Sequence, residues 1–289
     1  MKKEEKEKST IEPVESEVLQ QQAQVEQQEE SPVEQQEESP VEQTEEEEVI
    51  DDPTAVKLTV LVVCTELDSK LLRYALRSLA NLRGIDAEIK VTGTEKPDWL
   101  PHEDFIFVEG NTYMLTTIFN ALQQIKSERV VLMTDHTFIV NPVSFADIAI
   151  NKALPERPSE KESAVKILNA LDFDNRIENY RTHTPLYVFK SQLVEVLSAM
   201  VSTNIRTDDF ATVYCNLMYR DIKPLYLSWR NDQWVIPVIS QNPNKKDVLA
   251  YVKKKKFLYM QQCNEHLLDI LATLFPTPCE AEIPDENNE

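Results

Sequence analysis

The chain has 289 residues with 50 acidic and 30 basic side chains, a formal net charge of −20, and only 3 glycines. Residues 1–52 hold 19 of the acidic residues and 4 lysines, so this segment carries −15 and the remainder −5. A chain without a basic excess has no field that attracts phosphate backbones, so no nucleic acid is expected as a partner. Three glycines also exclude collagen-like chains and Gly-rich linkers.

The N-terminal segment is built on an eight-residue repeat. VEQQEESP occupies residues 25–32 and again 33–40, and VEQTEEEE follows at 41–48. This segment has too few apolar side chains to offset the entropy that the chain would lose on ordering. Residues 1–52 are therefore predicted to be a disordered acidic tail. Such a tail either solubilises the chain or binds a protein partner. We expect one domain over 53–275 and a flexible C-terminal tail over 276–289.

Between the tails, strand and helix patterns alternate. Continuous β-branched runs indicate strands that are buried on both faces, and apolar residues at helical spacing indicate amphipathic helices. The pattern predicts strands at 57–65, 87–92, 105–109 and 129–133, with helices at 68–82 and 114–124. This alternation is typical of an α/β fold with a mainly parallel sheet flanked by helices.

The second half of the domain is more mixed. Pro and charged residues predict a surface loop at 155–163. Strand-like runs occur at 186–189, 223–229 and 234–239, and helices are expected at 192–201, 209–219 and 245–274, the last interrupted near four lysines. Trp229 and Trp234 flank a short polar turn, where core packing is the favoured interpretation and a sugar-binding platform the alternative.

No targeting or membrane-spanning segment is expected. The opening residues are charged, and no apolar run is long enough to cross a bilayer. Four scattered cysteines without a C-x-x-C pair indicate reduced thiols and a cytoplasmic location. Lys253, Lys254, Lys255 and Lys256 precede an apolar and aromatic run, which indicates either a solvated helix face or peripheral contact with an anionic membrane.

Polar residues follow the predicted strands, where a parallel sheet binds its ligands. Thr134, Asp135 and His136 follow the fourth strand directly. A carboxylate and an imidazole at this position can bind a divalent cation that also contacts phosphate oxygens. The alternatives are that Asp135 caps a turn and that His136 is a hydrogen-bonding residue of the protein interior.

Two blocks of the sequence resemble a family. LTVLVVCTELDSKLLRYALRSLANLRGIDAEIKV is similar to the opening of a GT-A glycosyltransferase of the family-2 type, and FVEGNTYMLTTIFNALQQIKSERVVLMTDHTFIVNP is similar to its next block. Asn111 and Asn120 match asparagines of that block, and Thr134-Asp135-His136 stands at its D-x-D metal motif. The resemblance covers roughly residues 58–227 and implies a GT-A-like (Rossmann-like) fold.

The resemblance also implies roles for individual residues. Asp135 and His136 would hold Mn or Mg directly or through water. At most one of them would reach the metal, because neighbours point apart in an extended chain, and Asp135 is the one expected to do so. Asp209 would be the catalytic base, with Asp208 beside it. The donor would be a nucleotide sugar and the acceptor a glycan, protein or lipid-linked hydroxyl. The residues that would bind the nucleotide-sugar cofactor are Thr65, Glu66, Asn111 and Asp135.

The sequence also departs from the family pattern. Thr134 replaces the first D-x-D acid, His136 replaces the last, and Thr92-Gly93-Thr94 stands where an acid usually follows the second strand. Asp208 and Asp209 also suit an ordinary helix N-terminus. Two functional hypotheses follow: a glycosyltransferase, or a catalytically inactive GT-A-like binding or structural module that is tethered through its acidic tail.

Overall fold

The structure, a computed structural model, describes residues 56–64, 70–108, 113–238 and 242–282. The chain divides into two units, Met1–Ile50 and Asp51–Glu289, and every described residue belongs to the second. The acidic repeat therefore lies outside the described residues, as do the predicted nucleotide-binding residues Thr65, Glu66 and Asn111.

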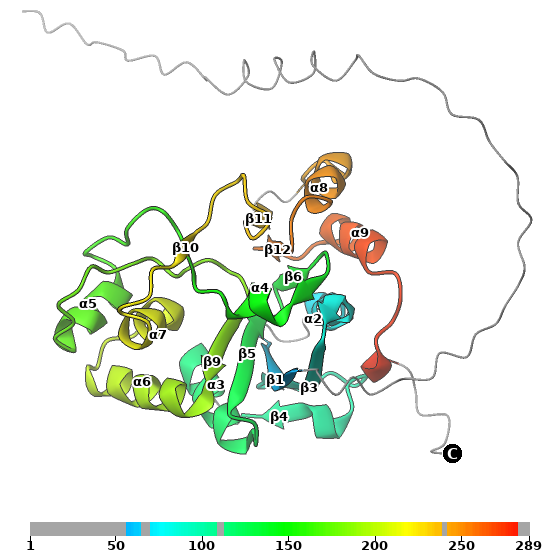
Figure 1. Cartoon of the computed structure of the whole chain (residues 1–289). Coiled ribbons are helices and arrows are strands. Elements are labelled where there is room, and N and C mark those ends of the chain that lie inside the picture. Colours follow the sequence, from blue (N-terminus) through cyan, green and yellow to red (C-terminus); the bar gives the residue numbers. More distant parts are fainter. Residues whose placement is uncertain (1–55, 65–69, 109–112, 239–241, 283–289) are drawn as a thin grey trace, which may run out of the picture. The chain divides into compact units, whose positions relative to one another are not determined.

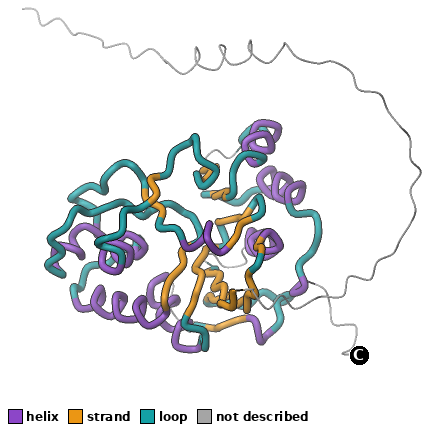
Figure 2. Tube along the Cα trace, in the orientation of Figure 1, coloured by secondary structure: helices purple, strands orange, loops and turns teal. Residues whose placement is uncertain are grey.

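A five-stranded sheet forms the centre of the domain (Figures 1 and 2). Its strands are β1 (Val56–Val63), β3 (Ile85–Gly93), β4 (Phe105–Phe107), β5 (Arg129–Thr134) and β9 (Leu186–Phe189). Their order is β4-β3-β1-β5-β9; the first four run parallel, and β9 pairs with β5 antiparallel. The mainly parallel α/β sheet predicted from the alternating pattern is thus confirmed.

Strand β1 is mostly apolar, and its residues from Leu58 onward are buried. Leu58, Val60 and Val62 belong to one buried cluster, whereas Leu61 and Val63 belong to the other. Successive side chains of a strand point to opposite faces, so both faces of this sheet are covered. One cluster contains buried residues of α2 (Lys70–Ser78), α8 (Lys245–Val252) and α9 (Glu265–Leu274). The other contains residues of α3 (Met114–Gln124), α5 (Ser163–Ala170), α6 (Lys190–Ser202) and α7 (Phe210–Met218).

Smaller sheets and helices complete the fold. A three-stranded sheet has the order β11 (Val235–Val238), β12 (Phe257–Met260), β6 (Thr137–Ile139), with β12 parallel to β11 and antiparallel to β6. The remaining elements are β2 (Leu82–Arg83), β7 (Val143–Ser144), β8 (Lys152–Ala153), β10 (Leu225–Tyr226), α4 (Phe145–Ala149), and the 3-10 turns η1 (Leu79–Asn81), η2 (His102–Asp104) and η3 (Glu280–Glu282). Among the described helices, none combines the length and the apolar character that crossing a bilayer requires.

The prediction of one interrupted helix over 245–274 is wrong in its middle. Residues 257–260 form strand β12 between α8 and α9. Asn244 and Asn264 each begin a new helix, because their side chains accept hydrogen bonds from the backbone N–H of Lys246 and Leu267 respectively. The apolar run after the lysines is therefore a buried strand and not a membrane-facing helix.

The four lysines also differ in their surroundings. Lys253 and Lys254 are exposed, whereas the ammonium group of Lys256 lies 2.6 Å from Asp147 Oδ1 and 3.1 Å from Asp232 Oδ2.

The two tryptophans of the predicted polar turn also differ in their surroundings. Trp234 is half-buried but Trp229 is 67% exposed, so core packing was the wrong expectation for Trp229.

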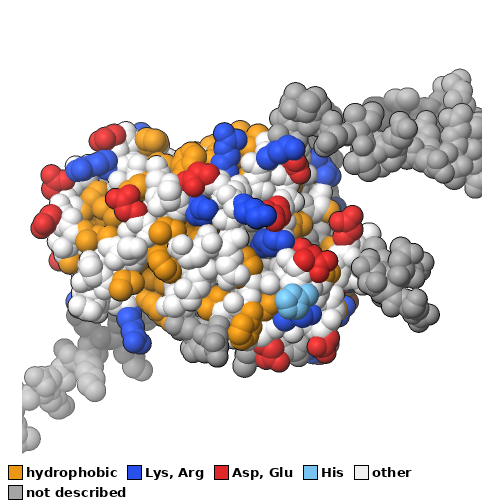
Figure 3. Space-filling view, turned by 90° about the horizontal axis from the view of Figure 1, so that it is seen from below, with side chains coloured by type: hydrophobic (Ala, Val, Ile, Leu, Met, Phe, Trp, Pro, Cys, Tyr) orange, Lys and Arg blue, Asp and Glu red, His pale blue; other side chains and the backbone are white. Residues whose placement is uncertain are grey.

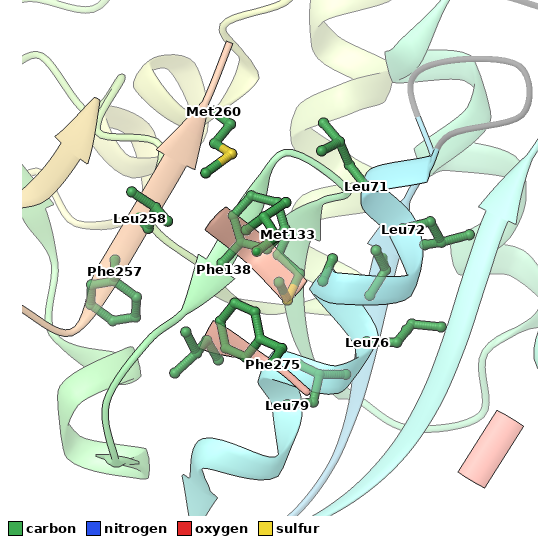
Figure 4. Packing of buried hydrophobic residues seen from close by; sticks show 14 of the residues in the cluster. Leu71, Leu72, Leu76, Leu79, Met133, Phe138, Phe257, Leu258, Met260 and Phe275 are labelled. Atoms are coloured by element: carbon green, nitrogen blue, oxygen red, sulfur yellow. The ribbon is translucent and has the colours of Figure 1, made fainter. Parts of the chain in front are cut away.

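The larger part of the core joins the central sheet to the three-stranded sheet. Figure 4 shows Leu79, in the turn that follows α2, on the same side of this helix as Met133, Phe138 and Phe275, whereas Leu72 and Leu76 point to its other side. Phe138 is completely buried, and its ring centroid lies 6.2 Å from that of Phe275 just after α9. Residues from the two ends of the domain therefore share one core.

Asp147 is the polar centre of the region between α4 and β12. Its Oδ2 accepts hydrogen bonds of 2.9 Å from both the backbone N–H and the hydroxyl of Ser144, which forms the capping box of α4. Its Oδ1 accepts from Lys256 and, at 2.8 Å, from Gln233. Burial opposes ionisation, but the hydrogen bonds from Lys256 and Ser144 outweigh it and lower the pKa of Asp147 to about 2.

This pKa predicts a loss of stability in acid. The carboxyl is more acidic in the folded chain than in the unfolded one, so its contribution is present above pH 4 and is lost as the pH falls from about 4 to about 2. We expect Asp147→Asn to lower the free energy of unfolding by about 2 kcal/mol at neutral pH and to flatten its decline in acid. Chemical denaturation at several pH values measures this.

Asp86→Asn is the matched control for that experiment. Asp86 lies 3.4 Å from Lys57 at the surface, where both side chains are largely exposed. Such pairs contribute little, so the control should retain the acid dependence of the unmodified chain. An Asp147→Asn chain that loses stability in acid as steeply as the unmodified chain would contradict the assignment.

Candidate functional site

A cavity of about 350 Å³ opens at the carboxyl end of β5. Its walls come from the end of β5, the start of α3, residues 148–152, residues 180–187, the start of α7, and the two residues Tyr259 and Gln261. Because β1 and β5 are parallel, their carboxyl ends meet at this edge of the sheet, where α/β proteins bind their ligands.

The cavity brings together three of the predicted site residues. His136, Asp208 and Asp209 line it, although His136 follows β5 and the two aspartates precede α7. Asp135 is not among the lining residues: its side chain is fully buried, its backbone N–H donates to Val63 O at 3.2 Å, and the Cys64 thiol lies 3.6 Å from its Oδ2. Asp135 therefore lies beneath the site, while Asp208 is exposed at its rim.

Asp209 has two different carboxylate oxygens. Oδ1 caps α7 by accepting a hydrogen bond of 3.1 Å from the backbone N–H of Thr212. Oδ2 is buried and has no hydrogen-bond partner among the described residues. Burial raises the pKa of Asp209 above its ordinary value, while the hydrogen bonds from Thr212 and the charge of Arg181 oppose that rise. A buried carboxylate oxygen without a donor has an unfilled position for accepting a proton.

Tyr113, which precedes α3, holds the segment that leads to Asp209. Its hydroxyl donates to Thr207 O at 2.8 Å and accepts from Thr207 N at 2.9 Å. The Thr207 hydroxyl in turn accepts a hydrogen bond of 3.1 Å from Asp209 N. The position of Asp209 therefore depends on α7 and, through Tyr113, on the start of α3.

We expect Tyr113→Phe to lower the free energy of unfolding by about 2 kcal/mol, because it removes two hydrogen bonds of roughly 1 kcal/mol each. The pKa of Asp209, followed by carboxyl carbon NMR, should fall toward its ordinary value as the loosened segment admits water. Tyr251→Phe is the control, since Tyr251 is 57% exposed. Equal stability and an unchanged Asp209 titration in Tyr113→Phe would refute this role.

His136 is oriented by the strand β12. Its Nδ1 lies 2.6 Å from the backbone oxygen of Met260. A carbonyl oxygen only accepts hydrogen bonds, so Nδ1 carries the proton and Nε2 carries the lone pair in the neutral ring. Nε2 lies 3.9 Å from Asp135 Oδ1. Each end of the imidazole therefore has a defined neighbour.

These two donor atoms are farther apart than neighbouring ligands of one divalent cation. Ligand atoms at 2.0–2.2 Å from an octahedral or tetrahedral cation are separated by about 2.8–3.6 Å, whereas Asp135 Oδ1 and His136 Nε2 are 3.9 Å apart. Within the described part of the chain, no group of three or more His, Cys, Asp or Glu side chains is arranged to hold a metal ion. Any cation here would take its remaining ligands from water or from a bound anion.

Three further residues of the cavity were not found from the sequence. The ring of His183 stacks on Tyr259 with centroids 4.1 Å apart, and His183 has a positive φ of 55°. Lys152 is 4% exposed and donates to the carbonyl oxygens of Asp147 and Ile150 near the end of α4; burial lowers its pKa to about 8. These residues come from segments far apart in the sequence, so no local pattern brings them together.

Among known proteins, similarity to this chain is found only at the level of solved structures. No protein-family model matches the chain, and no curated protein sequence matches it significantly. The apo glycosyltransferase GlyE of Streptococcus pneumoniae TIGR4 is similar at 10% identity and a TM-score of 0.42, over 77% of this chain and 61% of that one. The bifunctional glycosyltransferase WbbM is similar at 13% identity and a TM-score of 0.43, over 79% of this chain and 51% of that one.

A nucleotidyltransferase is also among the similar structures. The 2-C-methyl-D-erythritol 4-phosphate cytidylyltransferase of Thermus thermophilus has 16% identity and a TM-score of 0.36, over 58% of this chain and 87% of that one. The chain thus spans about three fifths of GlyE and half of WbbM. All these TM-scores lie below 0.5, so the functional proposal rests on the cavity. The fold and the cavity together define an α/β protein with a cavity at the carboxyl edge of its sheet.

Proposed function

We propose that the chain is a GT-A-like glycosyltransferase that transfers a sugar from a nucleotide-sugar donor to an acceptor hydroxyl in the cavity. The observation that carries the proposal is the buried, unpartnered Oδ2 of Asp209, a residue that lines the same cavity as His136 just after β5. Transfer of a sugar from a nucleotide sugar needs two kinds of side chain at one cavity. One is a general base for the acceptor hydroxyl, and the other is a group that faces the departing diphosphate.

In the proposed reaction Asp209 Oδ2 takes the proton of the acceptor hydroxyl. The acceptor oxygen then forms a bond to the anomeric carbon of the donor sugar, and the bond from that carbon to the phosphate oxygen breaks. The nucleoside diphosphate leaves with the electron pair of the broken bond. Burial of Asp209 favours the proton transfer, because a raised pKa makes the carboxylate a stronger base.

The remaining residues have supporting parts in this proposal. His136, which lines the cavity, would hold Mn or Mg, with its imidazole kept in the required tautomer by Met260 O, whereas Asp135 lies beneath the cavity. The cation, when bound, neutralises the charge that develops on the departing diphosphate. Asp208, at the exposed rim, lies where an incoming acceptor would pass.

Nucleotide binding provides the direct test. Titration calorimetry with UDP, GDP and CDP in the presence of Mn should detect binding of one of them, and His136→Ala should weaken it. Lack of binding of every nucleoside diphosphate would overturn the proposal. Binding without turnover of any donor sugar would favour the alternative of an inactive GT-A-like module.

A further inference from the structure

Five exposed side chains of two neighbouring segments form what we call the aromatic-basic patch: Trp229, Arg230, Tyr251, Lys253 and Lys254. Trp229 is 67% and Tyr251 57% exposed, which is unusual for large aromatic side chains. The first two residues lie in the loop between β10 and β11, and the other three lie at the end of α8 and just after it (Figure 1).

Contacts made by the two other lysines join these segments. The ammonium group of Lys255 donates to the backbone oxygens of Trp229 and, at 2.7 Å, of Asn231. The backbone N–H of Lys256 donates to Asp232 O at 2.8 Å. The loop of Trp229 is therefore fixed against the turn that carries Lys253 and Lys254, although more than 20 residues separate them in sequence.

The cations of the patch are not neutralised. Arg230, Lys253 and Lys254 form no ion pair with any carboxylate in the described ranges, whereas Lys256 is paired with Asp147 and Asp232. The Arg230 guanidinium lies 5.2 Å from the centre of the Trp229 ring, so charge and aromatic surface are adjacent. Elsewhere the two signs mix: acidic and basic side chains are interspersed on the face shown in Figure 3.

We propose that the aromatic-basic patch binds the surface of an anionic membrane. Trp and Tyr place their rings at the level of lipid headgroups, and nearby Lys and Arg are attracted by anionic lipids. The patch lies on a loop and the end of α8 and does not line the cavity described above, so it suits a broad surface rather than an inserted peptide. Trp229 and Tyr251 would supply the aromatic contact with the membrane. The apolar run that follows the lysines cannot do so, because it forms the buried strand β12.

Co-sedimentation of the full chain with lipid vesicles tests this proposal. The chain should pellet with vesicles that contain phosphatidylserine, and not with vesicles of phosphatidylcholine alone. Each lysine contributes about fivefold to binding at a membrane surface, so Lys253→Glu/Lys254→Glu should lower the partition coefficient by at least about 25-fold. Trp229→Ala should lower it as well, and its effect should persist when salt is raised.

Lys161→Glu/Lys166→Glu is the matched control, because both lysines are exposed and the change in net charge is the same. It should pellet like the unmodified chain, and circular dichroism confirms that all variants are folded. Three results would overturn the proposal: no pelleting with phosphatidylserine vesicles, an equal loss in the control variant, or full binding by Trp229→Ala. Binding to soluble polyglutamate but not to vesicles would show that the partner is an acidic protein instead.

Discussion

Asp209→Asn is expected to lower the turnover of a nucleotide-sugar donor by about 10²–10⁴-fold, the usual contribution of a general base. Asparagine has almost the same shape but cannot take the acceptor proton. It is also an equally good helix cap, so the hydrogen bond from Thr212 N to Oδ1 is retained. Binding of the nucleoside diphosphate should therefore be unchanged. Release of the diphosphate from a panel of donors, with a glycan mixture as acceptor, measures the loss.

The same substitution should leave stability unchanged or raise it. Burial raises the pKa of Asp209, so the folded chain binds this proton more tightly than the unfolded chain does. The stability of the unmodified protein accordingly falls as the pH rises from the ordinary pKa of Asp through the raised value. Asparagine carries no charge into the interior, so a thermal melt at neutral pH should show an equal or higher midpoint.

Asp208→Asn is the control, since Asp208 is exposed at the cavity rim. On the proposed function, turnover by the unmodified chain should also rise with pH through the raised pKa of Asp209, because only the ionised carboxylate accepts a proton. The assignment of the base would be wrong if Asp209→Asn kept full turnover, or if both variants lost it equally.

Phe138→Ala should have the largest effect on stability, about 3–5 kcal/mol in the free energy of unfolding. Phe138 on β6 is completely buried, and it packs between α2 and Phe275 (Figure 4). Its removal leaves a cavity where the central sheet, the three-stranded sheet and the C-terminal helix meet. Denaturant unfolding followed by circular dichroism measures the change.

Phe107→Ala is the matched control, because Phe107 on β4 is 57% exposed. A surface truncation of this kind is expected to change the free energy of unfolding by about 0.5 kcal/mol or less. Similar losses for the two variants would mean that Phe138 is not a centre of the core.

The sequence predicted the elements that carry a clear period. The helix Met114–Gln124 and the strand Leu186–Phe189 agree with the structure to the residue, and β1, β3 and β5 agree within a few residues. Two-residue strands such as β7 and β8 were missed, because so short a segment has no period and depends on its partner, whereas β10 lies within the strand-like run predicted at 223–229. Strand β12 was assigned to a helix because its four apolar residues suit either structure.

Some residues that line the cavity were singled out from the sequence. Asp208, Asp209 and His136 were found because each adjoins an element that the sequence predicts. The buried position of Asp135 was not predicted. In an extended chain Asp135 and His136 point to opposite sides, but the sequence does not show which of the two faces the cavity. His183 and Tyr259 come together only through tertiary contacts, which no spacing within one segment shows.

The pairing of β6 with β12 has a consequence for the order of folding. It joins segments about 120 residues apart, and the bond between His136 and Met260 spans 124 positions. Contacts of such long range form late, because the loop they close must lose its freedom first. During synthesis, β1, β3, β4 and β5 can assemble while one side of the cavity is still missing. We therefore expect the chain to acquire its central sheet before its binding site, and ligands to stabilise only the last step of folding.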